Sequence, residues 1–106
     1  MKFTGLLFFL CCFIVAGATA QQYPSADQID TDEGTLSVQP IQHGTLVLGW
    51  DGQSVYVDPT GGTSAFEGIG APDLILITHA HGDHMYIETL KALDTNDVTM
   101  IVPQSV

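Results

Sequence analysis

Short apolar runs, separated by turn residues, fill the chain from residue 35 onward, and their spacing predicts strands. The runs 45–50 (TLVLGW) and 54–57 (SVYV) are joined by an Asp-Gly dipeptide, so they predict a β-hairpin. The alternating run 35–41 (TLSVQPI) predicts a further strand before this hairpin. Its Pro40 indicates a sheet edge, because proline has no N–H to donate to a neighbouring strand.

The following segments predict a parallel unit. Residues 73–78 (DLILIT) are almost purely apolar, as expected of a strand covered on both faces. A helical spacing of apolar residues follows in 85–93, and the run 98–102 (VTMIV) predicts another buried strand. The glycine-rich segment 60–70 predicts a loop with a short helical turn at 64–67. We therefore expect an α/β fold, a β-hairpin followed by β-loop-α-β with a right-handed crossover.

The N-terminal segment predicts export. Lys2 precedes an unbroken apolar run at 5–15, and residues 18–20 (ATA) fit the small-x-small pattern of a cleavage site. Residues 1–20 therefore predict a secretory signal peptide, and with it a secreted or periplasmic protein that has no stable membrane anchor after cleavage. An uncleaved anchor is the alternative, but the run is shorter than the ~20 apolar residues that a spanning helix needs.

The rest of the chain divides into a leader and one domain. Residues 21–34 (QQYPSADQIDTDEG) are polar and acidic without periodicity, which predicts a flexible leader. Residues 35–106 predict the domain. A parallel sheet needs cover on both faces, and one helix covers only one of them. We therefore expect 35–106 to be the N-terminal part of a larger domain, truncated at its end.

The charge balance excludes several classes of partner. The chain has two Lys or Arg against 12 Asp or Glu and a formal net charge of −10, and removal of 1–20 would leave Lys91 as its one base. Nucleic acids and anionic membrane surfaces require basic side chains, so we expect a small-molecule substrate and no nucleic-acid partner. Both cysteines lie in the signal segment, so no disulfide is expected after cleavage. The sequence does not indicate an oligomeric state.

The chemistry of the chain is concentrated in the run HAHGDH, which directly follows the apolar strand and holds three of the four histidines. Imidazole and carboxylate groups are the ligands of zinc and related divalent metals. His79 and His81 are two residues apart, so in an extended loop both lie on the same side and can share one metal. The glycine frees the backbone to turn Asp83 and His84 towards a second metal. This run predicts a metal site at the carboxyl end of a strand, where sites of α/β proteins form.

The motif THAHGDH resembles the HxHxDH signature of the metallo-β-lactamase-fold hydrolase superfamily. The resemblance extends over HGTLVLGWDGQSVYVDP, APDLILITHAHGDH, MYIETLKAL and MIVP, which are similar to the N-terminal half of the branch related to ascorbate-phosphate lactonase. It implies an αββα sandwich, with two mixed sheets packed together and helices outside. This chain would form the N-terminal half of that sandwich.

The resemblance also implies roles for the residues of the motif. His79 and His81 would bind a first metal, and Asp83 and His84 a second, with Asp83 also acting as the catalytic residue that orients the nucleophile. Two zinc ions per complete domain are implied, with manganese or iron as other candidates. A metal-bound hydroxide would hydrolyse an ester, lactone or amide bond. In the family, ligands downstream complete the site, and no histidine follows His84 here, so the chain by itself is expected to be inactive.

Two residues outside the motif are further candidates. His43 stands between the first two predicted strands, where this family branch commonly has a histidine, and Asp58 ends a strand before a proline. Either can support the metal ligands or the substrate, although a strand-end histidine and an Asp-Pro turn also have ordinary structural explanations. Two other functions stay open, a non-catalytic secreted metal-binding module and an iron-dependent oxidoreductase of the same fold.

Overall fold

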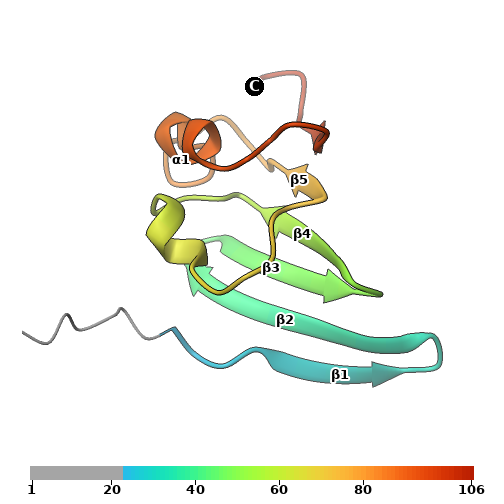
Figure 1. Cartoon of the computed structure of the whole chain (residues 1–106). Coiled ribbons are helices and arrows are strands. Elements are labelled where there is room, and N and C mark those ends of the chain that lie inside the picture. The colour runs from blue at the N-terminus through green and yellow to red at the C-terminus, as the bar shows by residue number, and fades with distance from the viewer. Residues whose placement is uncertain (1–22) are drawn as a thin grey trace, which may run out of the picture.

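The computed structural model describes residues 23–106, so the predicted signal peptide at 1–20 lies outside the described residues. In the described part, one sheet carries six strands in chain order (Figure 1): β1 (Asp27–Thr31), β2 (Gly34–Gln42), β3 (Thr45–Trp50), β4 (Gln53–Val57), β5 (Leu74–Leu76) and β6 (Thr99–Ile101). The described residues also form two short helices, η1 (Thr63–Phe66), a 3₁₀ helix, and α1 (Ile87–Ala92).

The sheet changes from antiparallel to parallel pairing at β4. Strands β1 to β4 form an antiparallel meander, whereas β5 runs parallel to β4, and β6 runs parallel to β5. The turn between β3 and β4 has positive φ angles at Asp51 (47°) and Gly52 (76°), as a type I′ hairpin requires. The predicted order of a hairpin followed by β-loop-α-β is confirmed. The described residues form one mixed sheet with little helix, and they do not include the second sheet of the expected αββα sandwich.

The core lies where η1 covers the middle of the sheet. Tyr56 of β4 and Ile75 of β5 are 1% and 0% exposed. The Tyr56 ring stacks on Phe66 of η1 with 4.7 Å between ring centroids, and its hydroxyl donates a hydrogen bond to the Gly70 carbonyl at 2.8 Å. Burial raises the pKa of Tyr56 above its ordinary value. The other buried apolar residues are Ile41, Val47, Ala65, Phe66 and Ile77.

The acidic leader is more ordered than the sequence suggests. Residues 27–31 form β1 and pair with β2 from Asp27↔Val38 to Thr31↔Gly34, so the prediction of a flexible segment is wrong for them. All five side chains of β1 are exposed, which explains why the sequence shows no apolar alternation there. The strand is held by backbone pairing and by local hydrogen bonds such as that from the Thr35 hydroxyl to Asp30 Oδ1 at 3.1 Å.

Burial of the parallel strands is one-sided. In β5, Ile75 is buried, whereas its neighbours Leu74 and Leu76 are only half-buried, so the expected cover on both faces is incomplete. The prediction of a buried last strand is wrong, because all three residues of β6 are exposed, with Ile101 at 57%. Strand β6 pairs only with β5 and ends the sheet, so its side chains lack the second layer that the sequence pattern anticipates.

Pro40 does not mark an edge strand, since β2 lies between β1 and β3. Its position is still a local edge, because β1 pairs with β2 only as far as Val38. A register shift between Pro40 and Gln42 also interrupts the β2–β3 ladder there. Among residues 23–106, no helix is long and apolar enough to cross a membrane.

Candidate metal and substrate site

The histidine-rich loop follows β5, and the structure brings its three imidazoles together. The ring centroids of His79 and His84 are 3.8 Å apart, and those of His79 and His81 are 4.8 Å apart. The loop turns back on itself through hydrogen bonds from the backbone N–H groups of His84 and Met85 to the His81 carbonyl, at 2.9 and 2.7 Å. Residues 81–84 thereby form a tight turn directly after the strand β5 and its continuation.

Asp58, directly after β4, ties this loop to the sheet. Its side chain accepts hydrogen bonds from the Thr78 N–H at 2.7 Å, from the Thr78 hydroxyl at 2.6 Å and from His84 Nδ1 at 2.7 Å. Asp58 is 2% exposed, and such burial by itself would raise the pKa of its carboxyl. The hydrogen bonds from Thr78 and His84 outweigh this effect and hold the pKa of Asp58 below its ordinary value. The structure thus places Asp58 where it can orient the loop.

The hydrogen bonds to Asp58 also determine which histidine nitrogens are free. An ionised carboxylate only accepts, so His84 Nδ1 carries the proton that it shares with Asp58 and leaves the lone pair of Nε2 unused. The Thr78 hydroxyl spends its one proton on Asp58, so at 3.1 Å from His79 Nδ1 it must accept. His79 therefore also presents Nε2 as a lone-pair donor. An imidazole held through Nδ1 by a carboxylate, as His84 is by Asp58, is a usual form of metal-binding histidines, and the Thr78 hydroxyl holds His79 in a similar way.

Asp83 and His43 lie at the open side of the loop. The Asp83 side chain is 62% exposed, and its Oδ2 atom is 3.5 Å from His84 Nε2. His43 adopts a positive φ of 49° between β2 and β3 and lines the same cavity as Asp83. Gly44 approaches the loop closely, because a Cβ atom there would lie 3.1 Å from His84 Cε1. All six residues singled out in the sequence therefore gather at one end of the sheet.

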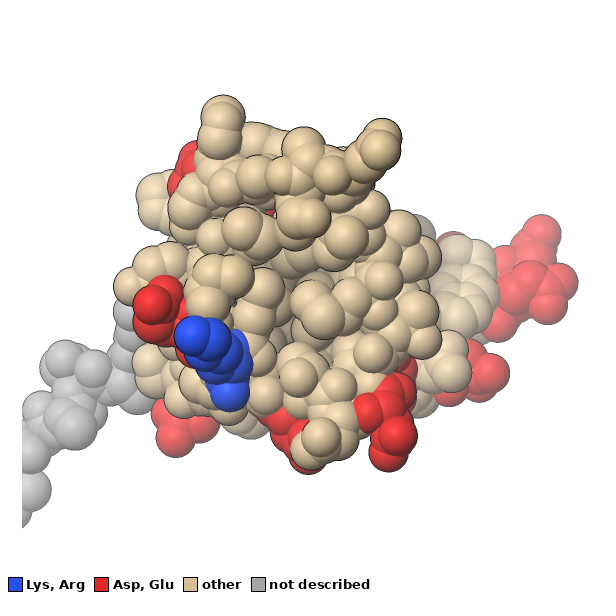
Figure 2. Space-filling model, turned by 90° about the horizontal axis from the view of Figure 1, so that it is seen from above, with Lys and Arg blue, Asp and Glu red and all other residues tan. Residues whose placement is uncertain are grey.

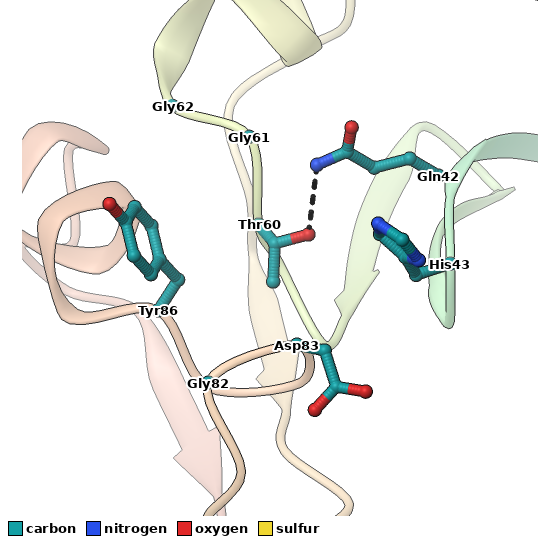
Figure 3. Close-up of a pocket in the computed structure, with 8 residues that line it drawn as sticks. All are labelled: Gln42, His43, Thr60, Gly61, Gly62, Gly82, Asp83 and Tyr86. Atoms are coloured by element: carbon teal, nitrogen blue, oxygen red, sulfur yellow. Dashed lines mark hydrogen bonds between the residues drawn. The ribbon is translucent and has the colours of Figure 1, made fainter.

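A cavity of about 510 Å³ opens beside the loop. Its volume is in the range of small-molecule sites. Figure 3 shows Tyr86 on one wall and Gln42 with His43 on the opposite wall, with Thr60 between them. Its lining residues are Gln42, His43, Thr60, Gly61, Gly62, Gly82, Asp83 and Tyr86.

Four further residues of the site were not predicted from the sequence, namely Gln42, Thr60, Thr78 and Tyr86. The signal for Thr78 and Tyr86 was their position, directly before and two residues after the HAHGDH run. Gln42 and Thr60 are neutral residues 18 positions apart, and the sequence held no signal that they meet.

The donor chemistry of this cluster fits a divalent metal, since two histidines are held with Nε2 free and a third lies beside them. Within the part of the chain that the structure describes, however, no three His, Cys, Asp or Glu side chains converge on a point where they could hold a metal ion. The ligand set is thus assembled in one place but is not closed around one centre.

Comparison with known proteins identifies the family of this chain and agrees with the resemblance found for the histidine motif. Residues 37–105 match the family described as "Beta-lactamase superfamily domain". A crystal structure of an inferred metal-dependent hydrolase from Parabacteroides distasonis ATCC 8503 is similar, with a TM-score of 0.67 and 31% sequence identity. The similarity covers 78% of this chain and 38% of that one, so this chain spans well under half the length of its structural relative.

No protein of curated function matches the chain significantly. The family match runs from β2 past β6 and includes the whole HAHGDH loop. The resemblance stated for the THAHGDH motif is confirmed by it. The chain therefore belongs to the β-lactamase superfamily, as a member with the metallo-β-lactamase motif.

Proposed function

We propose that this chain carries the metal-binding loop and part of the substrate pocket of a metal-dependent hydrolase. The observation that carries the proposal is the cluster of three imidazoles, two of them held with Nε2 free, beside a cavity of about 510 Å³. The name of the structural relative, an inferred metal-dependent hydrolase, supports the same reaction class.

His79, His81, Asp83 and His84 would hold the metal, with zinc as the first choice because imidazole and carboxylate ligands suit it. When bound, a divalent cation supplies a Lewis acid that polarises a carbonyl and lowers the pKa of water. Asp58 keeps His84 oriented, and the Thr78 hydroxyl does the same for His79. Asp83 lies at the cavity, where its carboxylate can accept a proton from an attacking water.

The proposed substrate is a small ester, lactone or amide. The cavity is lined by one acid and no Lys or Arg, which suits a neutral molecule better than a phosphate or a polycarboxylate. We further propose that the protein works outside the cytoplasm, on the strength of the signal-peptide pattern in residues 1–20.

The test is hydrolysis of a panel of lactones and esters by a zinc-loaded protein in which the metal site is complete, since this chain by itself is expected to be inactive. Turnover is measured before and after exhaustive chelation. We expect turnover to be lost on chelation and restored by zinc. Turnover that survives complete metal removal would show that the proposal is wrong. Elemental analysis of the purified protein distinguishes zinc from iron, and iron would favour the oxidoreductase of the same fold.

A second candidate, a binding module without catalysis, is favoured by one observation. The described residues do not converge on a finished metal centre. A protein with a complete metal site that binds zinc in proportion to its concentration, but hydrolyses nothing in the panel, would support this candidate.

A further inference from the structure

Gln42 forms one wall of the cavity and is held there by a chain of hydroxyl groups. Its Nε2 atom donates to the Thr60 hydroxyl at 3.2 Å (Figure 3). The Thr60 hydroxyl is 2.8 Å from that of Thr45, and the Thr45 hydroxyl donates to the Asp58 carbonyl at 2.6 Å. Thr45 and Thr60 are 3% and 5% exposed, so water does not compete for these contacts.

The number of protons in this chain fixes its direction. Thr45 has one hydroxyl proton, and the Asp58 carbonyl, which can only accept, takes it. In the contact between the two hydroxyls, Thr60 must therefore donate to Thr45. Thr60 then has no proton left, so it can only accept from Gln42. The Gln42 amide must present its NH₂ group to Thr60, because the flipped orientation would set two acceptors against each other.

The opposite end of the amide is consequently an acceptor. Figure 3 shows the Gln42 carbonyl oxygen turned away from Thr60. Within residues 23–106 it accepts no hydrogen bond, and no buried side-chain oxygen or nitrogen in this part is left without a partner, so the oxygen keeps solvent-accessible surface. Gly61 leaves room for the amide in this position, since a Cβ atom at Gly61 would lie only 2.6 Å from Gln42 Nε2.

The charge around the cavity also favours a neutral ligand that donates a hydrogen bond. Asp83 is the one acid among the lining residues, and none of them is Lys or Arg. In the described part of the chain Lys91 is the only base, and Figure 2 shows a single basic group among acidic ones on the surface seen from above. A neutral group that donates a hydrogen bond therefore matches the wall better than an anion does.

We infer that Gln42 is a specificity-determining residue, whose carbonyl oxygen accepts a hydrogen bond from a hydroxyl or N–H group of a neutral substrate. Thr60 is a positioning residue, which sets the direction of the Gln42 amide. This inference rests on the proposed function, because it assigns the contents of the cavity to the substrate of that hydrolysis.

Binding of matched small lactones tests the inference without any turnover. The probes are α- and β-hydroxy-γ-butyrolactone, each compared with its methyl ether, which has nearly the same shape but no donor. They are titrated into the full chain with a chelator present, and the backbone N–H signals of Gly61 and Gly62 report binding by NMR. A neutral hydrogen bond to Gln42 should favour one hydroxy probe over its ether by about three- to tenfold in affinity.

Variants show whether this preference depends on Gln42. The Gln42→Met variant keeps the length of the side chain and should bind each pair equally. Thr60→Val should lower the preference for the hydroxy probe, whereas Thr60→Ser, which keeps the hydroxyl, should retain it. Unfolding curves recorded for each variant separate this effect from a loss of structure.

Three results would overturn the inference. These are equal binding of each pair by the unmodified chain, a preference that persists in Gln42→Met, and no shift at Gly61 and Gly62 at the solubility limit of the probes. The titration uses no metal and no reaction, so its failure is distinguishable from the failure of the proposed function, which the chelation assay measures.

Discussion

The two edges of the sheet differ in chemistry although both are formed by regular backbone pairing. Strand β1 carries four acidic or polar side chains and one apolar one, Ile29 at 49% exposure, and all five of its residues are exposed. All three residues of β6 are also exposed, but two of them are apolar, Met100 and Ile101, at 43% and 57%. Charged side chains are the usual protection of an edge strand, whereas exposed apolar ones are its liability. The exposed edge at β1 is therefore mostly polar, whereas exposure at β6 leaves apolar side chains in contact with water.

Between these edges lie the strands that carry both the core and the site. Ile75 in β5 is fully buried, and the HAHGDH loop begins two residues after the last buried position of the same run, Ile77. Asp58 follows β4 directly and hydrogen-bonds to the loop. The candidate ligands are thus attached to the best-packed part of the sheet, as a preorganised site requires.

The largest expected effect contrasts the centre with the β6 edge. Ile75→Ala should lower the free energy of unfolding by about 2–5 kcal/mol, because it removes a fully buried side chain. The matched change Ile101→Ala, on the neighbouring strand, should change it by no more than about 0.5 kcal/mol. Urea denaturation measures both. Equal losses would show that β6 is covered in solution.

The next effect concerns the attachment of the loop to the sheet. Asp58→Asn replaces one acceptor oxygen by an NH₂ group, which must face a donor from Thr78 or His84. We expect zinc affinity to fall by about 10- to 100-fold, as for other partners of metal-binding histidines. Asp32→Asn, in the exposed β1–β2 turn, removes the same charge and is the control. A competition titration with a zinc indicator gives both affinities. Similar losses in the two variants would show that net charge, and not the contact of Asp58 with His84, determines the effect.

A smaller effect is expected at Gly44. A Cβ atom there would lie 3.1 Å from His84 Cε1 and 3.2 Å from His84 Nδ1, so the imidazole must move by a few tenths of an ångström. Gly44→Ala should weaken zinc binding by up to about tenfold, since His84 loses its alignment with Asp58. Gly70→Ala, whose Cβ atom would meet only the Ser54 hydroxyl at 3.4 Å, should leave the affinity unchanged. The same zinc titration compares the two, and unchanged affinity in Gly44→Ala would remove His84 from the ligand set.

The smallest effect is a pH dependence of the core. Burial raises the pKa of Tyr56 above 10.0, so the folded protein keeps the phenol proton at pH values where the unfolded chain has lost it. Stability from this residue is therefore complete below about pH 10 and declines as the pH rises towards the folded-state pKa. Thermal unfolding from neutral to alkaline pH should show a steeper decline for the unmodified protein than for Tyr56→Phe. Parallel curves would contradict the assignment.

The sequence predicted those parts of the fold that apolar burial or turn chemistry determines. The strand at 45–50, the hairpin turn at Asp51 and Gly52 and the parallel order of the last strands all follow from local pattern. Strand β1 was missed because its side chains are all exposed, so backbone pairing leaves no trace in hydrophobicity. Burial of β6 was overestimated because an apolar run shows what a strand prefers and not whether another layer covers it.

In the site, too, local sequence pattern could be predicted, whereas contacts between distant residues could not. The histidine spacing identified the loop, and Asp58 was found from its place at a strand end. The contact of Asp58 with His84 joins residues 26 positions apart, and its geometry comes only from the fold. Gln42 and Thr60 carry no charge and no motif, so nothing in the sequence marks them as neighbours across the cavity.

Zinc titration of the full chain, followed by the imidazole ring signals in NMR, tests the central claim most directly. The account predicts that zinc shifts the rings of His79, His81 and His84 together and to saturation. Replacing all three by alanine should abolish binding, and His43→Ala, which changes the histidine outside the loop, should preserve it. If zinc leaves the three rings unshifted, or binds equally well to the triple variant, this loop is not the metal site of the protein.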